Sequence, residues 1–502
     1  MNNPTSQFNP IFEPLPDNGE ATVIPEDLVE ELEEDLEDKA EAIPHAEILM
    51  RLLKQVKPVD FEKWADKNGK VKRVIYQVKV VEEVLRLAKK HEWGLCRIEG
   101  QIYLYNGEYW DIIEEKGFAV FLGRAALLMG APPFESQSYQ FKDHLFKQFD
   151  SAGYLPRPEP DPEKVLINLR NGTLEVTSEG YNRREFRAED FLTYQLPFDY
   201  NRNAVAPLFR QYLDEVLPDQ TSQMVMAEFI GYTLLRNASR RLKLEKALVL
   251  VGTGANGKSV FTEIVTAMLG EENVTAYPIH TLADNTGYFR AKAVGKLLNY
   301  VSESGEKLGD TEALKSLISG EPQMIRLPYK DPFVTANMPK LAFNTNSFPR
   351  DVEISDAFFR RFVTVPFSVT IPEAKQDREL HWKIIQEGLP GVFNWVMAGL
   401  DRLLKQKGFT ECAAVNKMLE RLRKEADSVA MFVEEEGYRV GKIGTKDYTK
   451  LRVLYREYVD YCRDTGTKAL RQVGFKNRLE DLGHLVGEYN DGVRVYVWKT
   501  GI

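Results

Sequence analysis

A glycine-rich segment in the middle of the chain constrains the fold more than any other feature. Residues 252–259 read Gly-Thr-Gly-Ala-Asn-Gly-Lys-Ser and satisfy the pattern G-x-x-x-x-G-K-[ST]. A short apolar run, residues 246–251, precedes the segment, and apolar residues recur with helical spacing over 260–269. A buried strand, a glycine loop and a helix in this order predict a phosphate-binding loop in a parallel α/β sheet.

The residues of this loop have expected roles in binding ATP and Mg²⁺. Glycines let backbone N–H groups approach the phosphates closely, and the N-terminus of the following helix adds partial positive charge. Lys258 is expected to contact the β- and γ-phosphates, and the Ser259 hydroxyl is expected to bind Mg²⁺. The predicted ATP-binding residues are Gly252, Thr253, Gly254, Ala255, Asn256, Gly257, Lys258, Ser259 and Val260.

Two later segments supply polar residues directly after predicted strands. Residues 296–301 lead to Glu303, which we predict to be the catalytic carboxylate and, with Ser259, a metal ligand. Residues 341–343 lead to Asn346, whose amide is expected to hold the γ-phosphate or the attacking water. A solvated surface glutamate and a turn-capping asparagine are the alternative interpretations.

A pair of arginines precedes a further predicted strand at 362–367. A guanidinium group at such a place can stabilise transition-state charge in a neighbouring subunit, as an arginine finger does. Arg361 is the first choice for this role and Arg360 the second. A structural ion pair is the alternative for either residue.

The order of these motifs resembles the superfamily 3 helicases. The glycine loop, GxGxNGKS, comes first, and the strand that ends at Glu303 follows it. The segment Leu-Lys-Ser-Leu-Ile-Ser-Gly at 314–320 is next, then residues 340–346, and Arg-Arg-Phe at 360–362 comes last. Within this group the chain is most similar to the helicase half of phage and plasmid primase-helicases, which are related to the poxvirus primase-helicase. The resemblance covers roughly residues 90–500 and is densest over 245–367.

The resemblance implies an AAA+ type hexamer that encircles a DNA strand and hydrolyses ATP at its subunit interfaces. Lys315 matches a basic residue that reaches the neighbour's nucleotide. Residues 324–330 match a hairpin in the central channel, where Lys330 would contact DNA phosphate with support from Arg326. Without the resemblance, a lysine at a loop tip is more often solvated than functional.

Two departures from the family pattern affect the expected activity. Many relatives have a second acid after the catalytic glutamate, where this chain has Ser304. Many relatives also carry a primase domain ahead of the helicase, whereas about 85 residues precede the resembling part here. We therefore expect a helicase without its own primase activity, paired with a separate primase or another replication protein.

Charge is distributed unevenly along the chain. The net charge is −9, but residues 1–41 alone carry thirteen acidic residues and one lysine, which leaves +3 for the rest. Leu28, Leu32 and Leu36 lie four residues apart in the acidic stretch 26–41, a spacing typical of one helical face. This stretch is expected to be a solvated, frayed helix; the alternatives are a docking helix for a partner and an intramolecular DNA mimic.

Several protein classes are excluded by composition. The three cysteines, Cys96, Cys412 and Cys462, are far apart and form no CxxC pair, which argues against a disulfide framework and a cysteine zinc site. No apolar run reaches the length of a membrane span, and the N-terminus has no signal-peptide pattern. We expect a cytoplasmic protein, in a bacterial host, that has no membrane contact.

The sequence divides into four predicted regions. Residues 1–45 form an acidic, largely disordered tail, and 46–235 form a mixed α/β domain with an extended piece near 71–80. Turn signals at Asn106-Gly107 and Asn171-Gly172 each predict a hairpin. Residues 236–408 form the P-loop AAA+ ATPase core, an α/β fold with a parallel sheet.

The last region, 409–502, resembles the winged helix that closes many of these primase-helicases, which implies a DNA-binding unit. Residues 446–478 contain nine Lys or Arg and four Asp or Glu. The second of two predicted helices, 470–482, carries Lys476 and Arg478, for which we expect phosphate contact. A helical packing module with an ordinary charged face is the alternative.

The leading function is an ATP-dependent replicative DNA helicase of a phage, plasmid or other mobile element. The family resemblance implies movement in the 3′→5′ direction on single-stranded DNA. A second hypothesis is an origin-binding initiator or loader that melts duplex origin DNA without processive travel. A third is a nucleotide-gated DNA-binding assembly protein that does little mechanical work.

Overall fold

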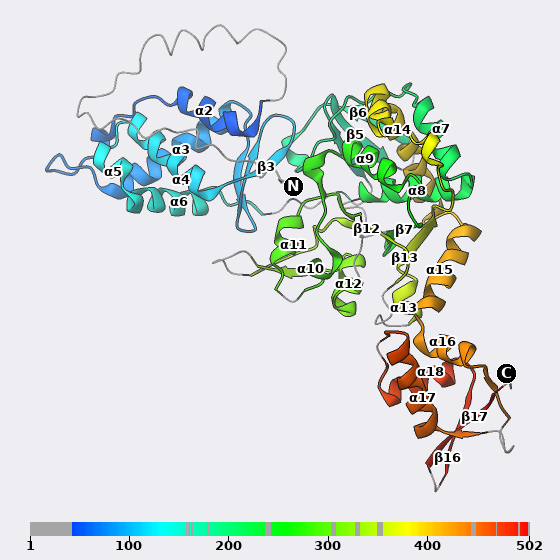
Figure 1. Ribbon diagram of the computed structural model, residues 1–502. Coiled ribbons are helices and arrows are strands. Elements are labelled where there is room, and N and C mark those ends of the chain that lie inside the picture. The colour runs from blue at the N-terminus through cyan, green and yellow to red at the C-terminus, as the bar shows by residue number, and fades with distance from the viewer. Residues whose placement is uncertain are drawn as a thin grey trace. The chain divides into compact units, whose positions relative to one another are not determined.

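A computed structural model describes residues 43–499 except for short gaps (Figure 1). The gaps are 157, 159–160, 162–163, 178–179, 236–241, 285, 303–307, 327–331, 349–354, 443–447, 468 and 490–491. The acidic stretch 26–41, Glu303, Ser304 and Lys330 therefore lie outside the described residues.

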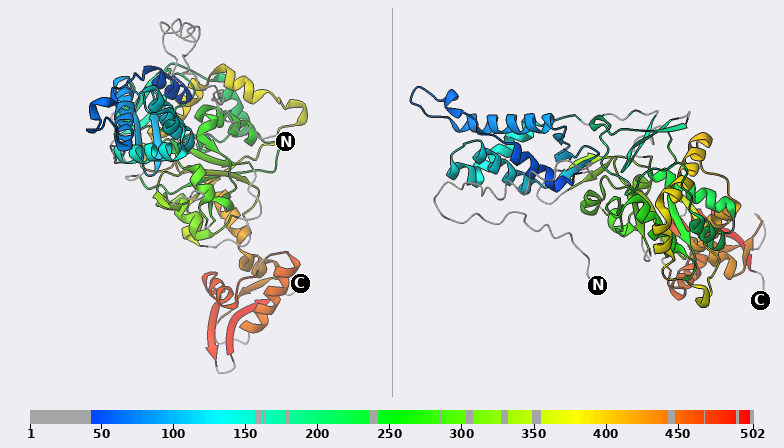
Figure 2. Two further views of the ribbon diagram at one scale, coloured as in Figure 1. Left: turned by 90° about the vertical axis from the view of Figure 1, so that its left-hand side faces the viewer. Right: turned by 90° about the horizontal axis from the view of Figure 1, so that it is seen from above.

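The first part of the described chain is a helical unit with a small sheet (Figures 1 and 2). The extended piece expected near 71–80 is wrong, because these residues begin a long helix. Val80, Val84 and Leu87 are buried at helical spacing, and this packing outweighs the strand preference of the β-branched residues. The helices are α2 His45–Gln55, η1 Phe61–Trp64, α3 Arg73–Lys90, α4 Glu115–Leu128, α5 Pro133–Gln137 and α6 Tyr139–Ala152.

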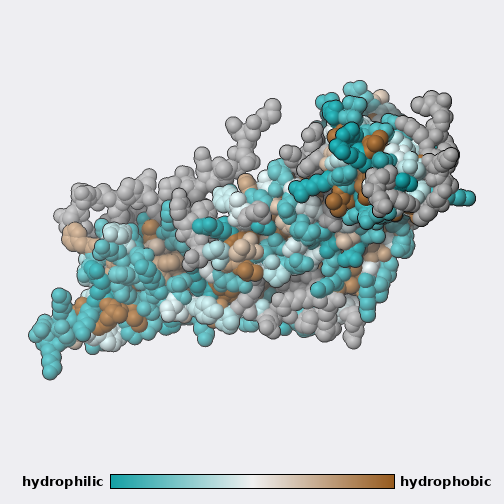
Figure 3. Space-filling view, turned by 90° about the horizontal axis from the view of Figure 1, so that it is seen from below, coloured by the Kyte–Doolittle hydropathy of each residue, from teal (hydrophilic) through white to brown (hydrophobic). Residues whose placement is uncertain are grey.

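The surface of the molecule alternates between polar and apolar areas. Figure 3 shows one face, on which apolar side chains gather in separate patches between larger hydrophilic areas. In the described part of the chain, no helix combines the length and the apolar content that crossing a bilayer requires.

Two small antiparallel sheets form before the central domain. β1 Leu95–Ile98, β2 Gln101–Tyr105 and β3 Trp110–Ile113 form the first sheet, and the Asn106-Gly107 signal marks its second turn. β4 Val165–Leu169, β5 Gly172–Thr177 and β6 Gly180–Arg184 form the second, in which Asn171-Gly172 turns the first strand into the next. Both hairpin predictions are confirmed.

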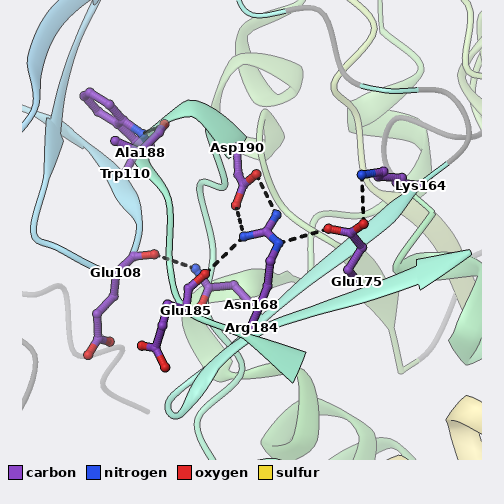
Figure 4. Close-up of polar contacts among 9 residues, drawn as sticks. All are labelled: Glu108, Trp110, Lys164, Asn168, Glu175, Arg184, Glu185, Ala188 and Asp190. Atoms are coloured by element: carbon purple, nitrogen blue, oxygen red, sulfur yellow. Dashed lines mark hydrogen bonds and ion pairs between the residues drawn. The ribbon is translucent and has the colours of Figure 1, made fainter. Parts of the chain in front are cut away.

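Polar side chains join these two sheets (Figure 4). The Asn168 amide donates to the Glu108 carbonyl at 2.8 Å, and the Trp110 indole donates to the Ala188 carbonyl at 2.8 Å. Arg184 binds both oxygens of Asp190 at 2.8 Å and also Glu175 at 2.9 Å. The second sheet is thereby fixed to the β2–β3 turn.

The central domain is built on a five-stranded parallel sheet. Its strand order is β13-β7-β12-β9-β8. The bounds are β7 Ala247–Val251, β8 Val274–Thr275, β9 Leu298–Val301, β12 Lys340–Thr345 and β13 Phe362–Pro366. β7 lies between β12 and β13 and is buried at every residue, as expected for a parallel strand covered on both faces.

Each face of this sheet packs against its own group of helices. On β7, Leu248 and Leu250 join the core formed with α7, α8, α9 and α14, whereas Ala247 and Val249 join the opposite core with α10, α12 and α15. The helices are α7 Pro207–Val216, α8 Gln220–Thr233, α9 Lys258–Leu269, α10 Ile279–Leu282, α11 Tyr288–Ala293, α12 Thr311–Ile318, α13 Asp356–Phe359, α14 Leu380–Gln406 and α15 Ala413–Ala426.

Helix α14 is bent and packs closely on α8. The backbone of Gly388 is non-helical, with φ 148°, and Pro390 follows it, so the helix has two arms. A Cβ on Gly399 would lie 2.4 Å from the carbonyl carbon of Ala227, which places the two helix backbones in direct contact. The buried Glu228 of α8 accepts from Arg402 of α14 at 2.9 Å and reinforces this contact.

The C-terminal unit has its own apolar core around Phe432, Tyr458 and Phe475. Its two long strands run side by side as an antiparallel pair (Figure 2). The elements are α16 Ser428–Glu435, β14 Tyr438–Val440, β15 Thr449–Lys450, α17 Leu451–Asp464, α18 Gln472–Asp481, β16 Leu485–Tyr489 and β17 Gly492–Lys499. The second predicted helix, 470–482, corresponds to α18.

Candidate nucleotide-binding cleft

A cleft of about 1160 Å³ opens at the carboxyl edge of the parallel sheet. The segments that follow β7, β9 and β12 line it, through Gly252, Ser302 and Asn346 respectively. Ligands of open α/β sheets bind at this edge, because loops after neighbouring strands converge there and helix N-termini point toward it. All nine predicted ATP-binding residues, 252–260, line the cleft.

The loop between β7 and α9 is a tight turn with left-handed backbone conformations. Gly254, Ala255 and Gly257 have positive φ values of 110°, 50° and 84°. A Cβ on Gly252 would lie 2.2 Å from the Asn256 amide nitrogen and 2.6 Å from the Phe367 carbonyl oxygen. Glycine at 252 is therefore required by close packing, and glycine at 254 and 257 by conformation.

The Lys258 side chain lies inside this loop. Its ammonium group donates to the Gly252 carbonyl at 2.6 Å and to the Asn256 side-chain oxygen at 2.8 Å. Burial lowers the pKa of the lysine, because the charged form loses hydration. An anion bound in the loop would stabilise the charged form of Lys258.

Three contacts support the loop from outside. The Tyr212 hydroxyl of α7 donates to the Gly257 carbonyl at 2.7 Å. The Asn256 amide donates to the Phe367 carbonyl at 3.1 Å, and the Ile371 N–H donates to the Ala255 carbonyl at 2.7 Å. Segments before and after the sheet thereby fix the shape of the loop.

The candidate metal and water-positioning residues have different environments. Ser259 is exposed at the start of α9, and Asn346 is exposed after β12. Asn344, two residues earlier, is buried and accepts from the Tyr300 hydroxyl at 2.7 Å, so it joins β12 to β9. Among the described residues, no group of three or more His, Cys, Asp or Glu side chains is arranged to hold a metal ion.

Arg360 and Arg361 lie at the amino edge of the sheet, opposite the cleft. The Arg361 carbonyl accepts from the Ala247 N–H at 2.8 Å at the start of β7. The Arg361 guanidinium donates to the Ser319 hydroxyl at 3.1 and 3.2 Å and lies 3.7 Å from Glu245, and its side chain is 13% exposed. Arg360 is exposed.

The residues predicted to contact a neighbour or DNA lie on α12 and on the hairpin that follows it. Lys315 of α12 forms an ion pair with Glu312 at 2.7 Å. β10 Gln323–Ile325 and β11 Phe333–Thr335 pair antiparallel, which confirms a hairpin at the predicted place. Arg326 is exposed just after β10, and Lys330 lies in the part of the hairpin outside the described residues.

Lys476 and Arg478 of α18 differ in their contacts. Arg478 binds Asp427 at 2.7 Å and Asp481 at 3.4 Å, and its side chain is 17% exposed. Lys476 has a single longer contact, 3.4 Å, with the exposed Glu488. Arg478 is therefore held by two carboxylates within the unit, whereas Lys476 is half-buried and has the weaker contact.

Sequence reasoning missed several residues of the cleft. Lys375 and Arg378 are exposed cations on its wall, and His381 beside them lies 3.2 Å from Glu263 of α9. These residues share one feature that could have identified them: they follow β13. The chain after a parallel strand lies at the carboxyl edge of the sheet, where the cleft opens. No spacing pattern marks them, which is why a motif search passes over them.

Comparisons with known proteins match two parts of the chain. Residues 250–361 match a family of unknown function (DUF5906), and residues 82–218 match a family described as D5 N terminal like. The first range begins within β7 and ends at Arg361, so it spans the phosphate loop and the strands around the cleft. The second range spans the second half of α3, helices α4 to α6, the two small sheets and α7.

Among solved structures, the apo C-terminal region of NrS-1 is similar over most of its length. Its A form has 13% sequence identity and a TM-score of 0.45, and the match covers 85% of this chain and 99% of that one. Two further structures of the same region have 12% identity, a TM-score of 0.43 and the same coverage. The similarity is distant, and no function is inferred from it.

Proposed function

We propose that this protein is an ATP-dependent DNA helicase of phage or other mobile-element replication, with an AAA+ type ATPase core of superfamily 3. The supporting observation is the phosphate loop, whose glycine conformations and buried Lys258 form an anion site at the carboxyl edge of a parallel sheet. The match of residues 82–218 to the D5 N terminal like family supports a phage replication protein.

Each residue of the cleft has a defined task in this proposal. Backbone N–H groups of the loop and the Lys258 ammonium bind the ATP phosphates, and the exposed Ser259 hydroxyl would bind Mg²⁺. When bound, Mg²⁺ would supply positive charge to neutralise the charge that develops on the phosphates. Glu303 orients the attacking water, and Asn346 holds that water or the γ-phosphate from the end of β12.

The proposal places ATP hydrolysis at the interfaces of a ring, by analogy with the resembling helicases. Arg360 and Arg361 lie at the edge of the sheet opposite their own cleft, so only a neighbouring subunit's nucleotide is within their reach. Because Arg361 is held by Ser319 and Glu245, we assign the arginine-finger role to the exposed Arg360. Arg361 then acts as a positioning residue for the start of β13, and Lys315 assists from α12.

The decisive test is ATP hydrolysis with and without single-stranded DNA. DNA is expected to raise the wild-type rate. Lys258→Ala is expected to lower it by on the order of 10²- to 10³-fold, because a preorganised charge on the transferring phosphates is lost. Arg360→Ala is expected to be as inactive. Lys417→Ala, an exposed lysine of α15, is the matched control and should behave as wild type.

Mixing experiments distinguish a ring from independent subunits. An excess of the Lys258→Ala variant should suppress the ATPase activity of the wild-type protein if neighbouring subunits share ATP sites. Glu303→Gln should bind ATP and DNA but not unwind. If DNA has no effect on the rate and Arg360→Ala remains active, the interface mechanism is wrong, and a nucleotide-gated assembly protein becomes the better explanation.

A further inference from the structure

The helical unit exposes two aromatic rings that its own fold does not use. Phe134 of α5 is 92% exposed, and Tyr139 at the start of α6 is 77% exposed. Single exposed apolar residues are common on protein surfaces, but a nearly bare phenylalanine with a second exposed ring five residues away is not. Five residues span at most about 17 Å, so the rings lie within reach of one extended ligand.

Further apolar surface lies next to Phe134. Glu135 forms an ion pair with Arg73 at 3.1 Å, and this contact fixes α5 beside the beginning of α3. Val74, the next residue of α3, is 54% exposed. We name Val74, Phe134 and Tyr139 the aromatic patch. Figure 3 shows apolar surface beside the hydrophilic projection at the left end of the molecule, where this unit lies.

Positive charge is concentrated in the part of the chain that leads into and forms α3. Residues 51–90 contain twelve Lys or Arg and five Asp or Glu, a balance of +7, and the Arg73–Glu135 ion pair brings the start of α3 to α5. Lys67, Lys70 and Lys72 are exposed in the turn that leads into α3. Lys142 lies one helical turn after Tyr139 on α6, a spacing that places both side chains on the same face.

We propose that the aromatic patch and these lysines bind single-stranded nucleic acid. Bases stack on Phe134 and Tyr139, and the lysines contact the phosphates. Exposed rings bordered by lysines suit this ligand, because stacking accepts any base and the phosphates need cations. Protein interfaces are depleted in lysine, and duplex DNA keeps its base faces covered, so both fit the surface less well.

This site is independent of the ATPase cleft and of the hairpin and α18 residues named above. It would hold the strand at a second place on each subunit. If this surface does not bind DNA, the helicase proposal still stands. If the cleft does not hydrolyse ATP, this surface can still bind DNA.

The test uses the full chain and a fluorescein-labelled oligodeoxythymidine of twenty nucleotides, with fluorescence anisotropy as the readout. Phe134→Ala/Tyr139→Ala is expected to weaken binding by on the order of 10- to 100-fold, since two stacked bases are lost. Tyr139→Phe should bind as wild type because the ring remains. Tyr154→Ala, which removes a ring that is 64% exposed elsewhere in the unit, is the matched control.

Three further readouts separate stacking from other effects. ATP hydrolysis without DNA should be unchanged in the double variant. Lys70→Ala/Lys72→Ala should reduce the salt dependence of binding. A 2-aminopurine oligonucleotide should lose part of its fluorescence change in the double variant. Unchanged DNA affinity overturns the proposal. So does an altered oligomeric size in sedimentation, which would make the patch an interface between copies.

Discussion

At the scale of single residues, the phosphate loop depends on a side chain that no motif contains. Tyr212 is buried on α7, and burial raises its pKa well above the ordinary tyrosine value, so the hydroxyl stays protonated and acts as a donor. Its bond to the Gly257 carbonyl fixes the residue that begins α9. The shape of the loop therefore rests on a helix that precedes it by about forty residues.

Removal of this hydroxyl should loosen the loop without unfolding the domain. Tyr212→Phe is expected to lower the free energy of unfolding by about 1 kcal/mol, because one hydrogen bond is lost and a carbonyl is left without its donor. Urea denaturation measures this change, and Tyr154→Phe on the surface is the control. If the two variants have the same stability, the hydroxyl does not support the loop.

Sequence analysis located residues where chemistry fixes the spacing. The loop pattern covers eight of the nine predicted ATP-binding residues, 252–259, and all nine line the cleft. It could not predict the partners of Arg361, since Ser319 and Glu245 approach it only through the fold. For the same reason Tyr212, Asn344 and Arg378 were missed. Their positions depend on how strands distant in the sequence pair.

At the scale of elements, glycine determines how closely α14 approaches α8. Gly399 lies against the backbone of Ala227, and Gly391 lies against that of Val205, where a Cβ would be 2.4 Å from the carbonyl carbon. Local propensity disfavours glycine within a helix, so its presence here reflects packing. The assignment of 71–80 failed for a similar reason, because the packing of α3 overrides the local preference of its residues.

Substitution of Gly399 tests this packing directly. Alanine should gain about 1 kcal/mol of helix propensity, but the backbone clash with α8 should cost about 1–3 kcal/mol and require the helices to separate. Gly399→Ala is therefore expected to melt at a lower temperature than wild type in calorimetry. Gly408→Ala, with its nearest atom at 4.0 Å, is the control and should be neutral. Equal melting temperatures would contradict the close approach.

At the scale of the whole molecule, helix α18 of the C-terminal unit carries one cation that is held by a buried carboxylate and one that is bound only weakly. Asp427 is buried, begins α16 by accepting from the Val429 and Ala430 N–H groups, and also binds Arg478. The pair joins α16 to α18. The excess of positive charge over 446–478 predicted a binding face. It could not show that Arg478 is in an ion pair and Lys476 is not held in the same way, because Asp427, the partner of Arg478, lies outside that stretch.

Two substitutions separate these roles. Arg478→Ala leaves the Asp427 carboxylate buried without its cation, which should cost about 3–5 kcal/mol and make the unit sensitive to limited proteolysis. Lys476→Ala should change stability by less than about 1 kcal/mol, so any weaker DNA binding reports a lost contact. If Arg478→Ala resists protease as well as the wild-type protein does, the ion pair is not needed for the stability of the unit.

The strand order of the parallel sheet has a consequence for synthesis on the ribosome. β7 is made before its two neighbours, and β12 and β13 begin about 90 and 115 residues later. At about 5–20 residues per second, the nascent chain holds an unpaired apolar strand for roughly 5 to 19 seconds before β12 is made. Pairing over such separations is also slow, because loop closure precedes any gain from contact. A growing chain of this protein therefore exposes an aggregation-prone strand during that interval.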